Sequence, residues 1–390
     1  MNHLTVAIVC AGVLTSVAGT VSAQDVVKIG QIEAQTGTFA TYGWMGHQGV
    51  NMAINEINRA GGFKVGDKTY KLQLISPDTR GNPQEALIQL KRMVEQDNAR
   101  YVFGPFLTNV FNGIQPYVSQ NNGKFLLMGG ATSIRFQFGK PGADTLMRTW
   151  NHDAGPNGFG KLMVDYLRKQ GVKKVAMLFI NDAFSKVAVD MYEPIFKDLG
   201  IELQIELFEP GTKDFSAPLA KLAAGKPDFL FPGYTDAVLY DIVRQATETG
   251  LFKRFFLVRG SMGPGLKNKD LIDDYVAYLP KYFEAAEKNE PKVKAFVAAY
   301  KAFYNTQDFP YDQAPLCSSS CYDHLYMLVE AMKRAGTVDD VAKVKKELMS
   351  MTYNGLWNIR YDATGEAVFD FDAVHMRKGG AITVTRIEPK

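Results

Sequence analysis

The fold is decided by residues 26–62, which read VVKIGQIEAQTGTFATYGWMGHQGVNMAINEINRAGG. Residues 26–32 are rich in Val and Ile and predict a buried strand. A helical pattern then runs through residues 49–57, and the two glycines at 61–62 end it. The stretch therefore predicts a strand followed by a helix, which is the first unit of an α/β sheet.

Strand and helix patterns continue to alternate along the chain. Residues 70–76, 101–104 and 125–128 are expected strands with helices between them. The pattern restarts after residues 148–150 with strands expected at 174–180, 202–208, 228–231 and 255–258. Helical patterns dominate 290–304, 319–335 and 339–349, and the tail from Tyr353 is strand-like. We therefore expect an α/β protein with two doubly wound parallel sheets.

Length and composition indicate a globular protein with more than one core. The chain has 390 residues, which exceeds one domain of roughly 150 residues. It is 46% hydrophobic and 22% charged, a balance typical of soluble globular proteins. The 44 Lys and Arg against 41 Asp and Glu give a net charge of only +3, so we expect no nucleic-acid partner.

The first 23 residues are expected to be a signal peptide. Residues 4–14 are apolar, and Val21, Ser22 and Ala23 have the small-residue pattern of a cleavage site after Ala23. The apolar run is shorter than the roughly 20 residues that span a bilayer. We therefore expect an exported chain without a membrane anchor.

Motifs that would make the chain an enzyme are weak or missing. Residues 155–161 have the Gly-x-x-x-x-Gly-Lys spacing of a phosphate loop, but Leu162 stands where a Mg²⁺-binding Ser or Thr is needed. The sequence contains neither Gly-x-Ser-x-Gly nor His-Glu-x-x-His. An exported hydrolase or amidase, built from carboxylates on loops, stays an alternative class.

Two cysteines, Cys317 and Cys321, lie outside the expected leader. They stand one helical turn apart, about 6 Å between Cα atoms, which is within disulfide range. With His324 they also share one helix face and form a candidate metal triad. No fourth ligand lies nearby in sequence, so a disulfide or core thiols are expected instead of a metal, and no cofactor is expected.

Segments spread along the chain match the pattern of one family, and they do so in the family's order. They are residues 27–30, 42–43, 49–58 with 60–62, 77–83, 104–105, 130–132, 213–215, 226–229 and 322–323. Together they resemble the type I periplasmic solute-binding proteins of ABC importers, in the branched-chain amino acid group. The resemblance extends from about residue 26 to residue 375, which is nearly the whole mature chain.

The resemblance implies two lobes that close on a solute about three hinge crossovers. One lobe would comprise residues 24–149 plus 281–357, and the other residues 150–280 plus 358–390. The crossovers would lie near 148–150, 278–281 and 356–359. A periplasmic monomer is implied, with a small-molecule solute and the membrane permease of an ABC importer as its partners.

By position, the resemblance implies that a ligand carboxylate meets Thr108, Thr132 and the backbone of Gly130. A helix N-terminus and a hydroxyl can hold an anion without any cationic side chain. The structural alternative is that Thr108 is only an N-cap.

Aromatic and polar residues would complete the implied site. Tyr42 and Trp44 would form an aromatic wall on the first lobe, and Phe184 would form one on the second. Thr235 and Asp236 fall in the loop where the family supplies a second-lobe contact.

Arg259 departs from the family pattern. Amino acid binders of the family place a carboxylate after the strand matching residues 255–258, whereas Arg259 would repel a ligand ammonium group. We therefore expect a small carboxylate without an α-amino group, and an aromatic one. Asp236 could supply the missing negative charge, so a branched-chain or other aliphatic amino acid stays the alternative.

Overall fold

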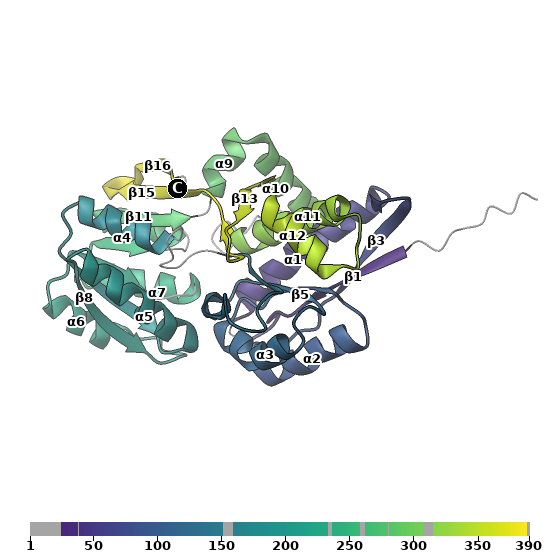
Figure 1. Cartoon of the computed structure of the whole chain (residues 1–390). Helices are drawn as coiled ribbons and strands as arrows, with labels where there is room; N and C mark the ends of the chain where they lie inside the picture. Colours follow the sequence, from purple (N-terminus) through teal and green to yellow (C-terminus); the bar gives the residue numbers. More distant parts are fainter. Residues whose placement is uncertain are drawn as a thin grey trace, which may run out of the picture.

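The computed structural model describes residues 25–37, 39–150, 159–232, 236–257, 262–279, 281–306 and 315–387. In this part of the chain, two large β-sheets flanked by helices form two lobes, and a small three-stranded sheet accompanies them (Figure 1). Most neighbouring strands run parallel, so the predicted α/β class is confirmed. No helix among the described residues is long and apolar enough to cross a membrane.

The first sheet has six strands in the order β2-β3-β1-β4-β5-β6. All pair in parallel except β2, which forms a hairpin with β3. The strands are β1 (Asp25–Gln31), β2 (Phe63–Val65), β3 (Lys68–Ile75), β4 (Tyr101–Phe103), β5 (Leu126–Gly129) and β6 (Leu146–Arg148). Its helical segments are α1 (Ala40–Arg59), α2 (Pro83–Glu95), α3 (Thr108–Gln120) and the 3₁₀ helix η1 (Thr132–Gln137).

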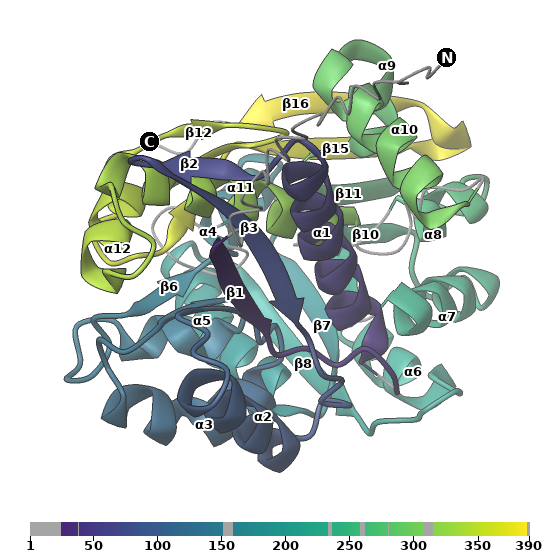
Figure 2. The same cartoon turned by 90° about the vertical axis from the view of Figure 1, so that its right-hand side faces the viewer.

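Helix α1 is fixed both to the sheet and to α11 (Pro315–Ala335), a helix from the last third of the chain. The Asn58 side chain donates to the carbonyl of Leu72 in β3 at 2.8 Å and accepts its N–H at 2.9 Å. A Cβ at Gly49 would overlap the carbonyl of Ser318, so a residue without a side chain allows the two helices to approach this closely. Figure 2 shows α1 in front of the sheet, near α11.

The second sheet has seven strands in the order β16-β15-β11-β10-β9-β7-β8. Strands β7 to β11 run parallel, and β15 and β16 add an antiparallel edge. The strands are β7 (Lys174–Ile180), β8 (Glu202–Phe208), β9 (Phe229–Pro232), β10 (Arg254–Leu257), β11 (Asp274–Leu279), β15 (Phe371–Arg377) and β16 (Ile382–Ile387). The helices are α4 (Phe159–Lys169), α5 (Ala183–Asp198), α6 (Ser216–Ala224), α7 (Asp236–Glu248) and α8 (Gly263–Lys267).

The C-terminal third of the chain is shared between the lobes. In Figure 1 the green and yellow helices lie with the purple and blue segments, whereas the yellow strands β15 and β16 lie with the teal segments. The returning elements are α9 (Phe283–Asn289), α10 (Pro291–Tyr304), α11, α12 (Val341–Ser350), β12 (Tyr353–Asn354), β13 (Asn358–Tyr361) and β14 (Ala367–Val368). The chain therefore passes between the lobes after β6, after β11, and between β14 and β15.

The third passage lies further along the chain than the predicted residues 356–359. Strand β13 pairs with β12 and β14 instead of the second sheet. A bridge between Arg148 and Glu366 holds the β13–β14 hairpin beside β6. An apolar strand pattern shows that residues form a strand but not which sheet they join. The lobe boundaries given above stay a prediction.

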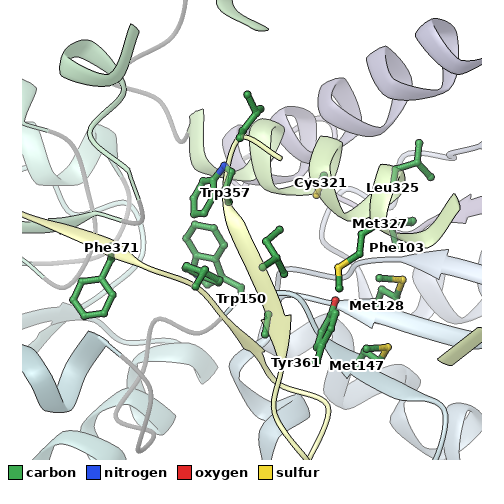
Figure 3. Packing of buried hydrophobic residues seen from close by; sticks show 14 of the residues in the cluster. Phe103, Met128, Met147, Trp150, Cys321, Leu325, Met327, Trp357, Tyr361 and Phe371 are labelled. Carbon is green, nitrogen blue, oxygen red and sulfur yellow. The ribbon is translucent and has the colours of Figure 1, made fainter. Parts of the chain in front are cut away.

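Buried contacts tie the first passage to the third. Arg148, fully buried at the end of β6, forms an ion pair with Glu366, which is 4% exposed. The Trp150 ring packs on Trp357 and Phe369, with centroids 6.0 and 5.9 Å apart. Figure 3 shows Trp150 and Trp357 together, between the lobes. The two passages are therefore anchored to one another by a charge pair and an aromatic cluster.

Candidate functional site

Two loops at the carboxyl edge of the first sheet bring predicted residues together. The loop after β4 leads to Thr108, the first residue of α3, and the loop after β5 leads to Thr132, the first residue of η1. The N–H groups of Gly130 and Ala131 both donate to the carbonyl of Pro105, at 3.1 and 3.0 Å. Thr108, Gly130 and Thr132 therefore lie on neighbouring, directly bonded loops.

The Thr108 side chain is buried and its hydroxyl is not used by the fold. Thr108 is 3% exposed, and its Oγ1 has no hydrogen-bond partner among the described residues. The N-cap of α3 is Leu107, and no side chain caps the helix, so Thr108 is not the N-cap. The first N–H groups of a helix are also donors without an intrahelical partner. The start of α3 is therefore equipped to bind an anion.

Phe106 forms a wall beside these loops, and sequence reasoning did not single it out. Its ring lies where a Cβ on Gly130 would be, and it is 3.0 Å from the Cβ position of Gly46 in α1. Its backbone N–H donates to Glu33 at 3.3 Å. Burial raises the pKa of the Glu33 carboxyl well above its usual range. The signal that could have revealed Phe106 is the pair of glycines whose missing side chains make room for its ring.

We expect the substitution Gly130→Ala to lower the free energy of unfolding by about 1–3 kcal/mol, the usual cost of overpacking. The added methyl group would overlap the Phe106 ring. Thermal denaturation measures the loss. The double variant Gly130→Ala with Phe106→Leu should regain part of the lost stability, because the smaller leucine side chain leaves room for the added methyl group. Equal stability of Gly130→Ala and the parent would contradict this packing.

Trp44 lies apart from this cluster. It is two residues from Gly46, which places it about 200° further around α1. Its ring, 42% exposed, stacks on His47 with centroids 5.2 Å apart, and His47 Nδ1 lies 3.0 Å from the Ser76 hydroxyl beyond β3. Burial lowers the pKa of His47. The structure thus pairs Trp44 with His47 and places Phe106 beside the Thr108 loop.

Helix α5 brings the second lobe to this edge of the first sheet. It contacts α3 and η1, the two elements that begin with Thr108 and Thr132. Asp182 caps α5 by accepting the N–H of Ser185 at 2.7 Å. Phe184, in the first turn of α5, is half-buried and packs against the core.

Other predicted site residues lie outside the described part of the chain. These are Thr235 and Arg259, together with the side chains of Tyr42 and Asp236. Their roles stay predictions.

The cysteine and histidine group of α11 lies in the core of the first lobe. Cys321 is buried, but the side chain of Cys317 lies outside the described residues, so the disulfide stays a prediction. His324 is buried, and its Nδ1–H donates to the Ser320 carbonyl at 2.8 Å. Burial lowers its pKa to about 4. Within the described ranges, no group of three or more His, Cys, Asp or Glu could hold a metal ion.

Two α/β lobes, joined by three chain passages and meeting at loops with buried hydrogen-bond donors, define a two-lobed binding protein. The chain belongs to the periplasmic binding protein family, whose model matches residues 26–381. The family resemblance read from the sequence is therefore confirmed.

Named relatives and solved structures match over most of the chain. The leucine-, isoleucine-, valine-, threonine- and alanine-binding protein of Pseudomonas aeruginosa is 26% identical over 93% of this chain and 92% of its own. A solute-binding protein of R. palustris in complex with benzoate has a TM-score of 0.74 at 15% identity, covering 93% and 98% of the two chains. A branched-chain amino acid binding protein of Streptococcus pneumoniae in complex with isoleucine has a TM-score of 0.72 at 20% identity, covering 93% and 100%.

Proposed function

We propose that this protein is the periplasmic substrate-binding component of an ABC importer. It captures a small carboxylate-bearing solute, an aromatic acid, between two closing lobes and delivers it to a membrane permease. The observation that carries the proposal is the buried Thr108 hydroxyl, which lies at the start of α3 beside the Phe106 ring and has no hydrogen-bond partner in the described part of the chain. The expected protein is a monomer, exported with cleavage after Ala23, and needs no cofactor.

A carboxylate suits the donors at this edge of the sheet. The hydroxyl of Thr108 and the first N–H groups of α3 all donate, and the helix dipole favours negative charge at that end. Hydrogen bonds to a charged group are stronger than those between neutral groups. An anion therefore gains more here than a neutral solute of the same size.

The choice between an aromatic acid and an amino acid depends on the rest of the ligand. The Phe106 ring beside the donors favours an aromatic ring, because offset or edge-to-face ring pairs add to simple burial. Arg259 in place of an ammonium-binding acid disfavours an α-amino group. The names of relatives that bind leucine, isoleucine and valine favour an aliphatic amino acid as the second candidate.

A thermal-shift panel tests the ligand class. We expect benzoate-like acids to raise the melting temperature more than leucine, isoleucine or valine. Ligand at 100 times its dissociation constant adds about 2.7 kcal/mol of stability, and each kcal/mol shifts the melting temperature by roughly 2–4 °C. Benzyl alcohol is the control without a carboxylate. Stabilisation by the aliphatic amino acids, with none from the aromatic acids, would overturn the aromatic assignment.

Two further measurements separate a receptor from an exported hydrolase or amidase. Mass spectrometry of solute released from denatured, freshly purified protein should identify a small carboxylic acid. A solute incubated with the protein should be recovered unchanged. Its conversion into a product would favour the enzyme.

A further inference from the structure

A second cavity, of ≈ 430 Å³, lies in the first lobe. Residues of α1, α10 and α11 and of the segment 353–356 line it. Its α1 residue is Glu56, ten positions after Gly46, which places the cavity about 15 Å along the helix from the Phe106 wall. The cavity is therefore separate from the loops that carry Thr108 and Thr132.

Aromatic rings and hydrogen-bond acceptors make up much of the cavity wall. Glu56 Oε2 accepts the hydroxyls of Tyr322 at 2.5 Å and Tyr326 at 3.0 Å. The two tyrosine rings lie 4.9 Å apart, and Phe296 lies 5.0 Å from Tyr322. Both hydroxyls are hydrogen-bonded to Glu56, and the two also interact with one another. The lone pairs that these bonds leave over on the phenol oxygens remain as acceptors. Burial raises the pKa of Tyr326 to about 12, so its phenol stays neutral.

A second carboxyl group, that of Asp323, lines the same cavity. It is 1% exposed and accepts the N–H of Trp357 at 2.8 Å and that of Leu356. Burial raises its pKa to about 7, although these N–H groups oppose the shift. Burial therefore destabilises the ionised form of the Asp323 carboxyl group, and a cation in the cavity would stabilise that form.

Lys292 is the one cationic side chain among the described residues that line the cavity. Lys292 is exposed in the first turn of α10, and its ammonium donates to the Asn354 carbonyl at 2.7 Å. The charge of Lys281, which does not line the cavity, and that of Lys292 both lower the pKa of Asp323. The protein's own ammonium group thus already interacts favourably with this wall, and it would compete with any cation that enters.

We propose that this cavity is a second binding site, for a small organic ammonium ion. The ammonium group donates to Glu56 and to the phenol oxygens, and its carbon atoms contact the aromatic rings. A neutral molecule of the same shape lacks the charge, and an anion would face the carboxyl groups of Glu56 and Asp323. The proposal is independent of which solute binds between the lobes.

Titration calorimetry of the full mature protein tests the site with a matched pair of probes, cyclohexylammonium and cyclohexanol. We expect the ammonium probe to bind at least about tenfold more tightly than the alcohol, the scale of a hydrogen bond to a charged group. Glu56→Gln should weaken ammonium binding by about tenfold or more. Lys292→Met should strengthen it, because this change removes the competing cation. The two substitutions therefore have opposite expected signs.

The control variant is Thr132→Ala, which changes the candidate solute site only. It should bind cyclohexylammonium as the parent does, so failure of the solute proposal leaves this test intact. Equal binding of the two probes, no binding of the ammonium probe, or loss of its binding in Thr132→Ala would overturn the ammonium site. If Glu56→Gln does not fold, the exposed substitution Lys292→Met decides: unchanged affinity there also overturns it.

Discussion

A Glu366→Ala variant is expected to lose about 3–5 kcal/mol of unfolding free energy, because it leaves a buried charge without its partner. Arg148 is fully buried, and its guanidinium forms an ion pair with Glu366. The backbone N–H of Arg148 also donates to the Gly365 carbonyl at 2.9 Å, which holds the main chain of Arg148 beside the β13–β14 hairpin. Urea denaturation monitored by circular dichroism measures the loss.

Two comparisons show whether burial of the charge is the cause. The double variant Arg148→Met with Glu366→Leu removes both charges and should recover much of the stability. Glu330→Ala removes an exposed ion pair with Arg334, 3.1 Å long, and should cost less than about 1 kcal/mol. A loss in Glu366→Ala no larger than that in Glu330→Ala would show that the buried pair does not anchor the passages.

The second large effect concerns solute affinity. Thr132→Ala is expected to weaken binding of the solute by about 1.5–3 kcal/mol, the range for a hydrogen bond to a charged group. This corresponds to roughly a 10- to 150-fold rise in the dissociation constant. Thr108→Ala should act in the same direction. Titration calorimetry, with the acid that gives the largest thermal shift, measures both.

Thr145→Ala is the matched control for these substitutions. Thr145 is 6% exposed, and its hydroxyl lies 3.1 Å from the Asn122 side chain. It precedes β6 and so lies at the amino edge of the sheet, away from Thr132. The control should lower stability and leave affinity unchanged. Unaltered affinity in both Thr108→Ala and Thr132→Ala would remove these residues from the site.

The parts of the fold with long periodic patterns could be predicted from sequence. The strand expected at 174–180 is β7, and the helix expected between the strands at 70–76 and 101–104 is α2. The short strands β2 and β6 were not predicted, because their pairing depends on neighbouring strands more than on their own residues. The partner of β13 was missed for the same reason.

Within the candidate site, sequence could predict the place of Thr108 and Thr132 in the fold, and their role stays a prediction. Thr108 and Thr132 begin helical segments after neighbouring strands, a pattern visible in sequence. Phe106 was missed because the space for its ring comes from Gly46 and Gly130, which are distant in sequence. Trp44 lies in α1 two residues before Gly46, so it faces about 200° away from the side of the helix that the Phe106 ring approaches.

The aromatic cluster between the first and third passages also gives the protein an internal optical probe. Of its three tryptophans, Trp150 and Trp357 are 1% and 2% exposed, whereas Trp44 is 42% exposed. An aqueous quencher therefore reduces the fluorescence of Trp44 first, and the fluorescence of Trp150 and Trp357 remains. The emission that survives quenching comes from the residues between the lobes. A change in this emission on addition of a solute would therefore report a rearrangement around these passages in the unmodified protein, in real time and without an attached dye.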